Sequence, residues 1–155
     1  LRNNRPKNKP FNLSYDPMTQ TLDISNNPWI KIAHCLQNFP AITINASNTS
    51  ISRGSNFNNS PVKSLNISNT QIVELRTLTC KNLKELNISG NIIHNIDPLE
   101  KYPLISLDIS YTPIKYLNFI PKLPFLKELT VHKGQFTKTQ FRWKTDNLKI
   151  IIKSF

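Results

Sequence analysis

Apolar residues recur at one spacing in three consecutive stretches of this chain. The stretches begin at Val62, Leu83 and Leu104, which are 21 residues apart. In each stretch apolar side chains occupy the first, fourth, sixth and eleventh positions, and Thr or Asn occupies the ninth. A fixed period of this length is typical of a solenoid, in which each unit buries its apolar face by stacking on its neighbours. The pattern therefore predicts a repeat architecture.

The same spacing continues on both sides of these three stretches. Upstream repeats begin at Thr19 and Ala41, and a downstream repeat begins at Leu126. In the downstream repeat Gly134 stands at the ninth position. We number the repeats one to six in chain order, and together they span residues 19–136.

The pattern L-x-x-L-x-I-x-x-T/N-x-I resembles the leucine-rich repeat, in the short class of 21–22 residues seen in internalin-like bacterial proteins. Thr70 and Thr112 stand at the ninth position, where that family more often carries Asn. The resemblance implies an α/β solenoid of six coils with a parallel β-sheet on its concave face. It also implies irregular or 3-10 return segments and capped ends.

The L-x-I part of each repeat predicts a short strand whose apolar residues point inward and whose central residue points outward. The outward column consists of Asp23, Asn45, Asn66, Asn87, Asp108 and Thr130. We expect a second outward column made of Ser25, Ser47, Ser68, Ser89, Ser110 and His132. The ninth-position Thr and Asn side chains should bond the backbone of the next repeat, because a buried unpaired polar group costs about 1–3 kcal/mol.

The return segments differ in their patterns. Apolar residues recur every three positions over 72–78 and 114–120, which predicts a single 3-10 or short α-helical turn in each. Residues 53–60 are poor helix formers, so we expect an irregular loop held inward by Phe57.

The chain outside the repeats predicts one domain with a tail. Residues 1–11 are basic and contain two prolines, so we interpret them as a linker or a disordered tail. We assign residues 12–155 to one leucine-rich-repeat domain, with an N-terminal cap over 12–18 and a C-terminal cap over 137–155. The expected core of the C-terminal cap is Phe136, Phe141, Trp143 and Ile150.

The net charge of +11 is concentrated at the two ends of the chain. Residues 1–10 hold four basic side chains and no acid, and residues 133–155 hold six against one acid. The repeats between them are nearly neutral, with ten basic and eight acidic residues over 11–132. A duplex-binding face would gather Lys and Arg on one surface, so this distribution argues against nucleic acid as the partner.

The two cysteines, Cys35 and Cys80, lie two repeats apart. Two coils separate equivalent positions by about 10 Å, whereas a disulfide needs Cα atoms within about 7 Å. We therefore expect two separate, buried and reduced thiols, which fits a cytoplasmic location without requiring one.

The sequence contains no signature for a metal, a nucleotide or another cofactor. One group of residues has the elements of an activated hydroxyl: Ser110 and His132 on adjacent strands, with Asp108 and Glu128 on the same face. However, Ser occupies this column in five consecutive repeats, which is a structural explanation for Ser110. We therefore expect no enzymatic activity.

These observations favour a non-catalytic, monomeric module that binds another protein through its concave face. By resemblance it belongs to the C-terminal part of a larger bacterial protein with a signalling or scaffold role. The alternative is an electrostatic binder that holds acidic lipid, polysaccharide or nucleic acid through its basic ends. The predicted partner-binding residues are Asp23, Asn45, Asn66, Asn87, Asp108, Thr130, Ser110, Tyr111 and His132.

Overall fold

The structure is a computed structural model that describes residues 12–31, 33–143 and 147–154. The linker predicted over residues 1–11 lies outside the described residues, and so does the side chain of Trp143. Within the described part of the chain, no helix has the length and apolar character needed to cross a bilayer.

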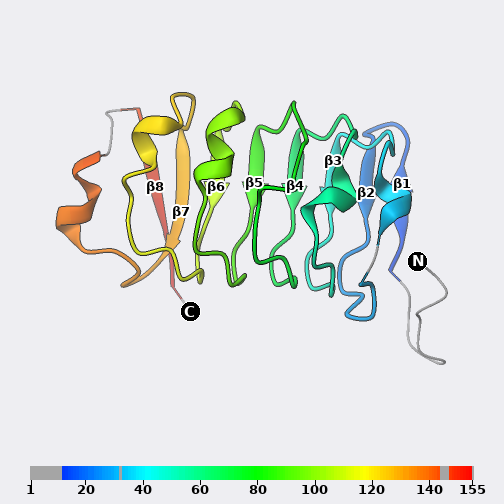
Figure 1. The fold of residues 1–155 in the computed structure, drawn as a ribbon, viewed down its shortest axis with the longest axis horizontal. Coiled ribbons are helices and arrows are strands. Elements are labelled where there is room, and N and C mark those ends of the chain that lie inside the picture. The colour runs from blue at the N-terminus through cyan, green and yellow to red at the C-terminus, as the bar shows by residue number, and fades with distance from the viewer. Residues whose placement is uncertain (1–11, 32, 144–146, 155) are drawn as a thin grey trace.

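Within the described residues, eight strands form a single sheet in chain order (Figure 1). Strands β2 to β8 pair in parallel, and β1 pairs with β2 in antiparallel orientation. The strands are β1 (Ser14–Asp16), β2 (Thr21–Asp23), β3 (Thr43–Asn45), β4 (Ser64–Asn66), β5 (Glu85–Asn87), β6 (Ser106–Asp108), β7 (Glu128–His132) and β8 (Lys149–Lys153).

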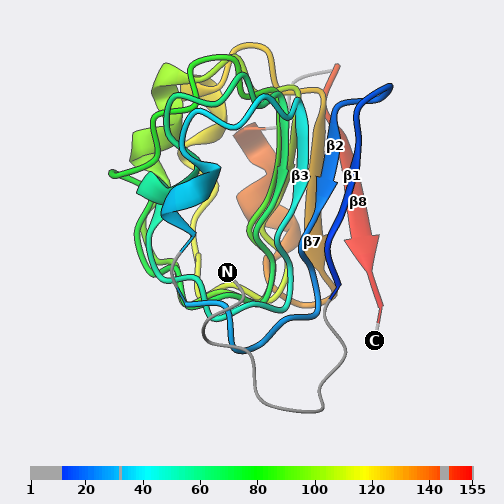
Figure 2. The same cartoon turned by 90° about the vertical axis from the view of Figure 1, so that its right-hand side faces the viewer.

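The strand register is the one that the sequence pattern predicts. Leu65 pairs with Leu86, and Leu86 pairs with Leu107, so the inward leucines form one column. These three leucines are at most 3 % exposed. The outward residues Asn66 and Asn87 are likewise paired across the strands. The sheet covers one side of the molecule and the return segments cover the other, with the core between them (Figure 2).

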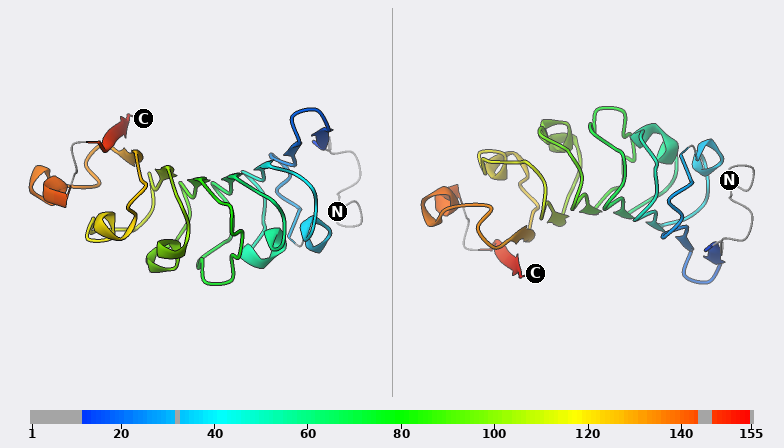
Figure 3. Two further views of the ribbon diagram at one scale, coloured as in Figure 1. Left: turned by 90° about the horizontal axis from the view of Figure 1, so that it is seen from above. Right: turned by 90° about the horizontal axis from the view of Figure 1, so that it is seen from below.

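Seen along the strands, the row of strands bows so that the outer face of the sheet lies on the inside of the curve (Figure 3). This is the concave face that the repeat pattern implies. The chain is therefore an open solenoid, with neighbouring repeats in contact along its whole length.

The return segments contain short 3-10 helices, but not all where the sequence predicts them. Residues 72–78 form no helix, although Ile72, Leu75 and Leu78 are all buried. Their three-residue period is satisfied by a bend and turn that direct each apolar side chain inward. The helices are η2 (His34–Leu36), η3 (Gly54–Phe57), η4 (Asp97–Lys101), η5 (Ile120–Lys122) and η6 (Lys138–Trp143).

Helix η3 lies within residues 53–60, where we expect an irregular loop, so that expectation is wrong. Asn56 closes the turn by donating from Nδ2 to the Arg53 carbonyl at 2.8 Å, and its Oδ1 accepts the Ala33 N–H at 3.2 Å. Gly54 packs closely on the next repeat, since a Cβ there would lie 3.1 Å from Leu78 Cβ. Phe57 is fully buried, as predicted.

Both ends of the sheet carry extra elements. Strand β1 lies against β2, and the rings of Tyr15 and Phe39 meet edge to face with centroids 5.0 Å apart. At the other end, Phe136 and Phe141 meet edge to face at 6.2 Å. Both of these phenylalanines and Ile150 pack against the core while remaining partly accessible.

Candidate functional site

The outward Asn and Asp side chains of the concave face hold the turn that follows each strand. Asn87 Oδ1 accepts the backbone N–H of Ser89 at 2.9 Å, and Asp108 Oδ1 accepts that of Ser110 at the same distance. This is the Asx-turn arrangement, in which a short polar side chain bonds its own backbone two residues on. Asp23, Asn45 and Asn66 make the equivalent bond at 2.8, 3.2 and 3.1 Å. The column is therefore already engaged with the backbone.

The serine column does not face outward as predicted. Ser110 is fully buried and Ser89 is 9 % exposed, because the chain turns toward the interior directly after each strand. Ser25, Ser47 and Ser68 are buried in the same way. Thr130, predicted as a surface residue, is also only 8 % exposed. These hydroxyl groups therefore contribute little surface for a partner.

The ninth-position side chains divide into two kinds of contact. Thr70 and Thr112 donate their hydroxyls to carbonyls of their own repeats, at Ile67 (3.0 Å) and Ile109 (2.6 Å). Asn91 instead spans two repeats, because its Nδ2 donates to the Ile67 carbonyl of repeat three at 2.7 Å. Its Oδ1 accepts the Thr70 N–H, also at 2.7 Å. The prediction that these side chains bond the backbone of the next repeat is therefore wrong. The two threonines bond the backbone of their own repeats, and Thr70 Oγ1 reaches only the side chain of Asn91 in the next repeat, at 3.2 Å. Asn91 bonds the backbone of the preceding repeat.

The tight turns after the strands form one edge of the sheet, which we call the turn edge. One residue per turn has a positive φ, a conformation that glycine adopts freely and that Asn tolerates better than most residues. Repeats one to three use Asn here, and their amides bond laterally: Asn48 to Asn26 at 2.8 Å and Asn69 to Asn48 at 3.1 Å. In chain order the turn-edge residues are Asn26, Asn48, Asn69, Gly90, Tyr111 and Gly134.

Tyr111 is the exception in this column, since it holds an aromatic side chain at φ 57°. Its ring stacks on His132 with centroids 4.8 Å apart and planes 11° from parallel. Its backbone N–H donates to His132 Nδ1 at 3.0 Å, which fixes the orientation of the imidazole. The Tyr111 side chain remains 37 % exposed. The stacked pair therefore forms an ordered aromatic surface at the turn edge.

The arrangement of an activated hydroxyl that the sequence suggested for Ser110, His132 and Asp108 does not form in the structure. The Ser110 hydroxyl donates to Asp108 Oδ1 at 2.7 Å, while His132 Nδ1 is occupied by the Tyr111 N–H. The second oxygen of Asp108 is paired with Lys153 Nζ at 2.6 Å. A general base must reach the hydroxyl that it activates, and here the imidazole is engaged elsewhere and the hydroxyl is buried. The geometry therefore does not support a nucleophilic serine.

After its strand, repeat six is shifted by one residue from the spacing that the sequence pattern predicts. Strand β7 is longer than the preceding strands, so the positive φ falls on Gly134 and the next residue, Gln135, takes the ladder position. Gln135 Nε2 donates to the Ile109 carbonyl at 3.0 Å, much as Asn91 bridges two earlier repeats. The signal in the sequence was Gly134 itself, since glycine marks the turn and not the ladder.

The two cysteines have different surroundings, although both thiols are free. Cys80 is buried, its thiol lies 3.1 Å from the Phe57 carbonyl, and burial raises its pKa to about 12. Cys35 is exposed, so the prediction of two buried thiols is wrong for this residue. It belongs to η2 on the surface of the return side, where only Leu36 is buried. Among the described side chains, no cluster of three or more His, Cys, Asp or Glu could hold a metal ion.

The stacked coils, the parallel sheet and the repeated turns define a leucine-rich-repeat solenoid. The family model described as "Leucine Rich repeats (2 copies)" matches residues 62–101, which include repeats three and four almost completely. No curated protein sequence matches the chain significantly.

Two solved structures from Listeria monocytogenes have similar folds. Internalin C2 superposes with a TM-score of 0.65 at 20% identity, over 87% of this chain and 74% of that protein. The internalin InlF superposes with a TM-score of 0.50 at 17% identity, over 76% of this chain and 44% of that protein. The similarity therefore spans less than half of InlF, and at these identities it establishes the fold.

Proposed function

We propose that this domain, over residues 12–155, is a non-catalytic module that binds another protein through the C-terminal half of its concave face. The observation that carries the proposal is Tyr111, an aromatic residue held at positive φ on the rim of that face. Backbone strain of this kind costs on the order of 1 kcal/mol and is kept where the side chain has a use. The neighbouring turns carry Asn or Gly, which avoid the strain.

The surroundings of Tyr111 suit a protein interface. Tyr, Trp and Arg are the residues that most often dominate binding energy, and a stacked, ordered tyrosine loses little conformational entropy on binding. His132 stacks on the ring, and the Asp108–Lys153 ion pair adds charged groups to the same face. Asn45, Asn66 and Asn87 extend this surface toward the N-terminus as a flat, less selective region.

The internalin-like fold supports placing the domain in a bacterial protein, and we extend this to a C-terminal position in a larger signalling or scaffold protein. The electrostatic alternative is less well supported. Lys149 and Lys153, two of the lysines that it requires, already face Glu128 and Asp108 at 3.4 and 2.6 Å. Both pairs would have to separate before these lysines could bind a polyanion.

The test is capture of a partner from a lysate of the source organism. Tyr111→Asn removes the ring but keeps a residue that tolerates positive φ, so the fold should persist and capture should be lost. Asn48→Gly, a change on the same edge three repeats earlier, is the matched control and should capture normally. Retained capture by Tyr111→Asn would refute the proposed site. Capture retained by Tyr111→Asn but lost after Lys138 and Lys149 are neutralised would favour the electrostatic alternative.

A further inference from the structure

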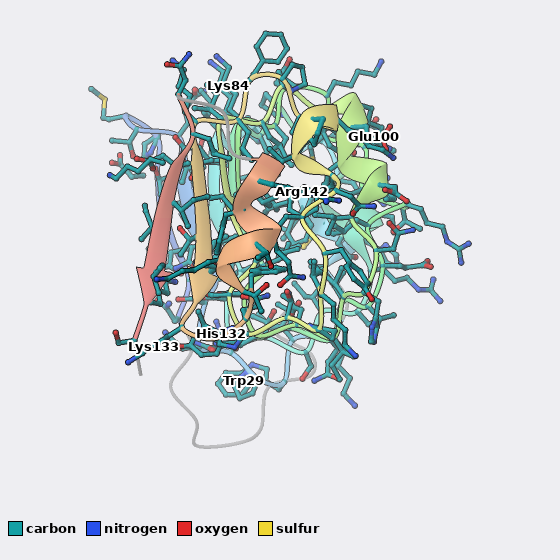
Figure 4. All side chains as sticks on the ribbon, turned by 90° about the vertical axis from the view of Figure 1, so that its left-hand side faces the viewer. Trp29, Lys84, Glu100, His132, Lys133 and Arg142 are labelled. Atoms are coloured by element: carbon teal, nitrogen blue, oxygen red, sulfur yellow. The ribbon has the colours of Figure 1, made fainter. Side chains whose placement is uncertain are left out.

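A second surface lies at the edge of the sheet opposite the turn edge, where the chain enters each strand. Figure 4 shows Lys84 at one edge and His132 at the other. Near Lys84 a groove of about 530 Å³ runs across the starts of repeats four to six. Its lining consists of Lys84, Pro103, Ile105, Pro124, Phe125, Leu126, Lys127 and Asn147.

The order of residues across the groove is fixed by the backbone. The Ile105 N–H donates to the Lys84 carbonyl at 2.7 Å, and the Lys127 N–H donates to the Ile105 carbonyl at 2.8 Å. Lys84, Ile105 and Lys127 are therefore lateral neighbours on three successive repeats. With strands about 4.8 Å apart, the two lysine backbones lie about 10 Å from each other on either side of the isoleucine.

The groove joins an apolar floor to positive charge. Phe125 is 60 % exposed, and Pro124 is exposed beside it. Lys84 and Lys127 are both exposed, and neither forms an ion pair with any residue that the structure describes. The described residues that line the groove include no carboxylate. Other lysines of the same side, such as Lys122, are instead paired with acids at 2.5 and 3.4 Å.

We propose that this groove docks an acidic polypeptide segment in which an apolar side chain is flanked by carboxylates. The apolar side chain would cover Phe125 and Ile105, and the carboxylates would bind Lys84 and Lys127. The volume is within the range of about 300–1,000 Å³ that binding pockets commonly have. Because unpaired positive charge lies on both sides of an apolar floor, a partner with carboxylates on both sides of an apolar side chain is electrostatically complementary to the groove. The groove is separate from the proposed concave site, so either can fail without the other.

A peptide is favoured over a nucleic acid by the floor of the groove. A nucleic-acid backbone needs a continuous row of cations that follows the phosphates. Here the row is interrupted by Ile105, and the surface beside it is formed by Phe125 and prolines.

The experiment uses a fluorescein-labelled peptide with a central Phe flanked by Asp and Glu, measured by fluorescence anisotropy against the whole chain. The control peptide has Asn and Gln in place of the acids and should bind much more weakly. Lys84→Gln combined with Lys127→Gln should weaken binding by about threefold to tenfold, as expected for two exposed charge pairs. Phe125→Ala should weaken binding by about tenfold through loss of the apolar contact.

The matched control is Lys63→Gln, in the same column one repeat before Lys84 but outside the groove, and it should leave the affinity unchanged. Tyr111→Asn should also leave it unchanged, which separates this groove from the concave face. Equal affinity for the two peptides would overturn the proposal, as would equal losses for Lys63→Gln and the double variant. Binding to phosphatidylserine vesicles or duplex DNA with no binding of the acidic peptide would also overturn it.

Discussion

The turn edge of repeats one to three differs from that of repeats four to six, although both satisfy the same backbone requirement. In the first half, Asn26, Asn48 and Asn69 supply the positive φ and bond one another through their amides. In the second half, glycine alternates with Tyr111, whose ring stacks on His132. In the first half these side chains therefore bond one another, whereas in the second half they present an ordered aromatic surface. Partner binding is therefore expected in the second half.

The two halves differ at the surface but rest on one hydrophobic core. Leu86 lies in the central strand β5, is 3 % exposed, and is flanked by Leu65 and Leu107. We expect Leu86→Ala to lower the free energy of unfolding by about 2–5 kcal/mol, as a buried truncation does. Urea denaturation followed by circular dichroism should show one transition for both proteins.

The control for Leu86→Ala is Ile92→Ala in the same repeat, where the side chain is 68 % exposed. This change should cost less than about 0.5 kcal/mol. Two separate transitions in Leu86→Ala would mean that the halves unfold independently and do not share one cooperative core.

The interior ladder provides the next test. Asn91→Ala removes the bond to the Ile67 carbonyl and leaves the buried Thr70 N–H without its acceptor, so it should cost about 2–4 kcal/mol. Thr112→Val keeps the shape of the side chain and removes one bond to Ile109. Because Gln135 also donates to that carbonyl at 3.0 Å, the cost should be only about 0.5–1 kcal/mol. Thermal and urea unfolding of both variants would measure this difference, and equal losses would contradict it.

Most of the fold could be predicted from the sequence because the same apolar pattern occurs in every repeat. The inward columns and the parallel order of β2 to β7 follow from a period that recurs six times. The returns are less predictable because they differ between repeats. The sequence could not show that Gly54 packs on Leu78 or that Asn56 accepts the Ala33 N–H, since both contacts cross between repeats.

The candidate site was predicted only in part. The sequence analysis names both Tyr111 and His132 as partner-binding residues, but it does not predict that their rings stack. The outward Asn column was treated as free surface, although Asn87 accepts the Ser89 N–H, so Asn87→Ala should cost about 1 kcal/mol and not a negligible amount. The repeat period predicts whether a side chain points inward or outward. It does not predict the Asx-turn bond, because that bond depends on the residue at which the strand ends. The groove beside Lys84 was missed because its residues come from positions that vary between repeats.

The two turn-edge glycines should differ in their tolerance of a side chain. Gly134→Ala adds a Cβ where no atom lies within 4 Å, so its cost comes from φ 83° and should be about 1 kcal/mol. Gly90→Ala has φ 70°, and its Cβ would also lie 2.0 Å from Asn69 Oδ1. Asn69 would have to move, and this steric clash adds to the backbone strain for a total cost of about 1.5–2 kcal/mol. Urea unfolding checks both values, and a larger loss for Gly134→Ala would show that contact with Asn69 is unimportant.

The smallest expected effect belongs to the asparagine ladder of the first half. Asn48→Gly removes both lateral amide bonds but keeps a residue suited to φ 55°. These amides are exposed and can bond water instead, so the free energy of unfolding should change by less than about 0.5 kcal/mol. Asn48→Ala removes the same bonds and adds the strain of a Cβ at positive φ, so it should cost about 1 kcal/mol. The difference between the two variants, measured by urea unfolding, isolates the backbone requirement. A large loss in Asn48→Gly would instead mean that the amide bonds themselves stabilise the first half.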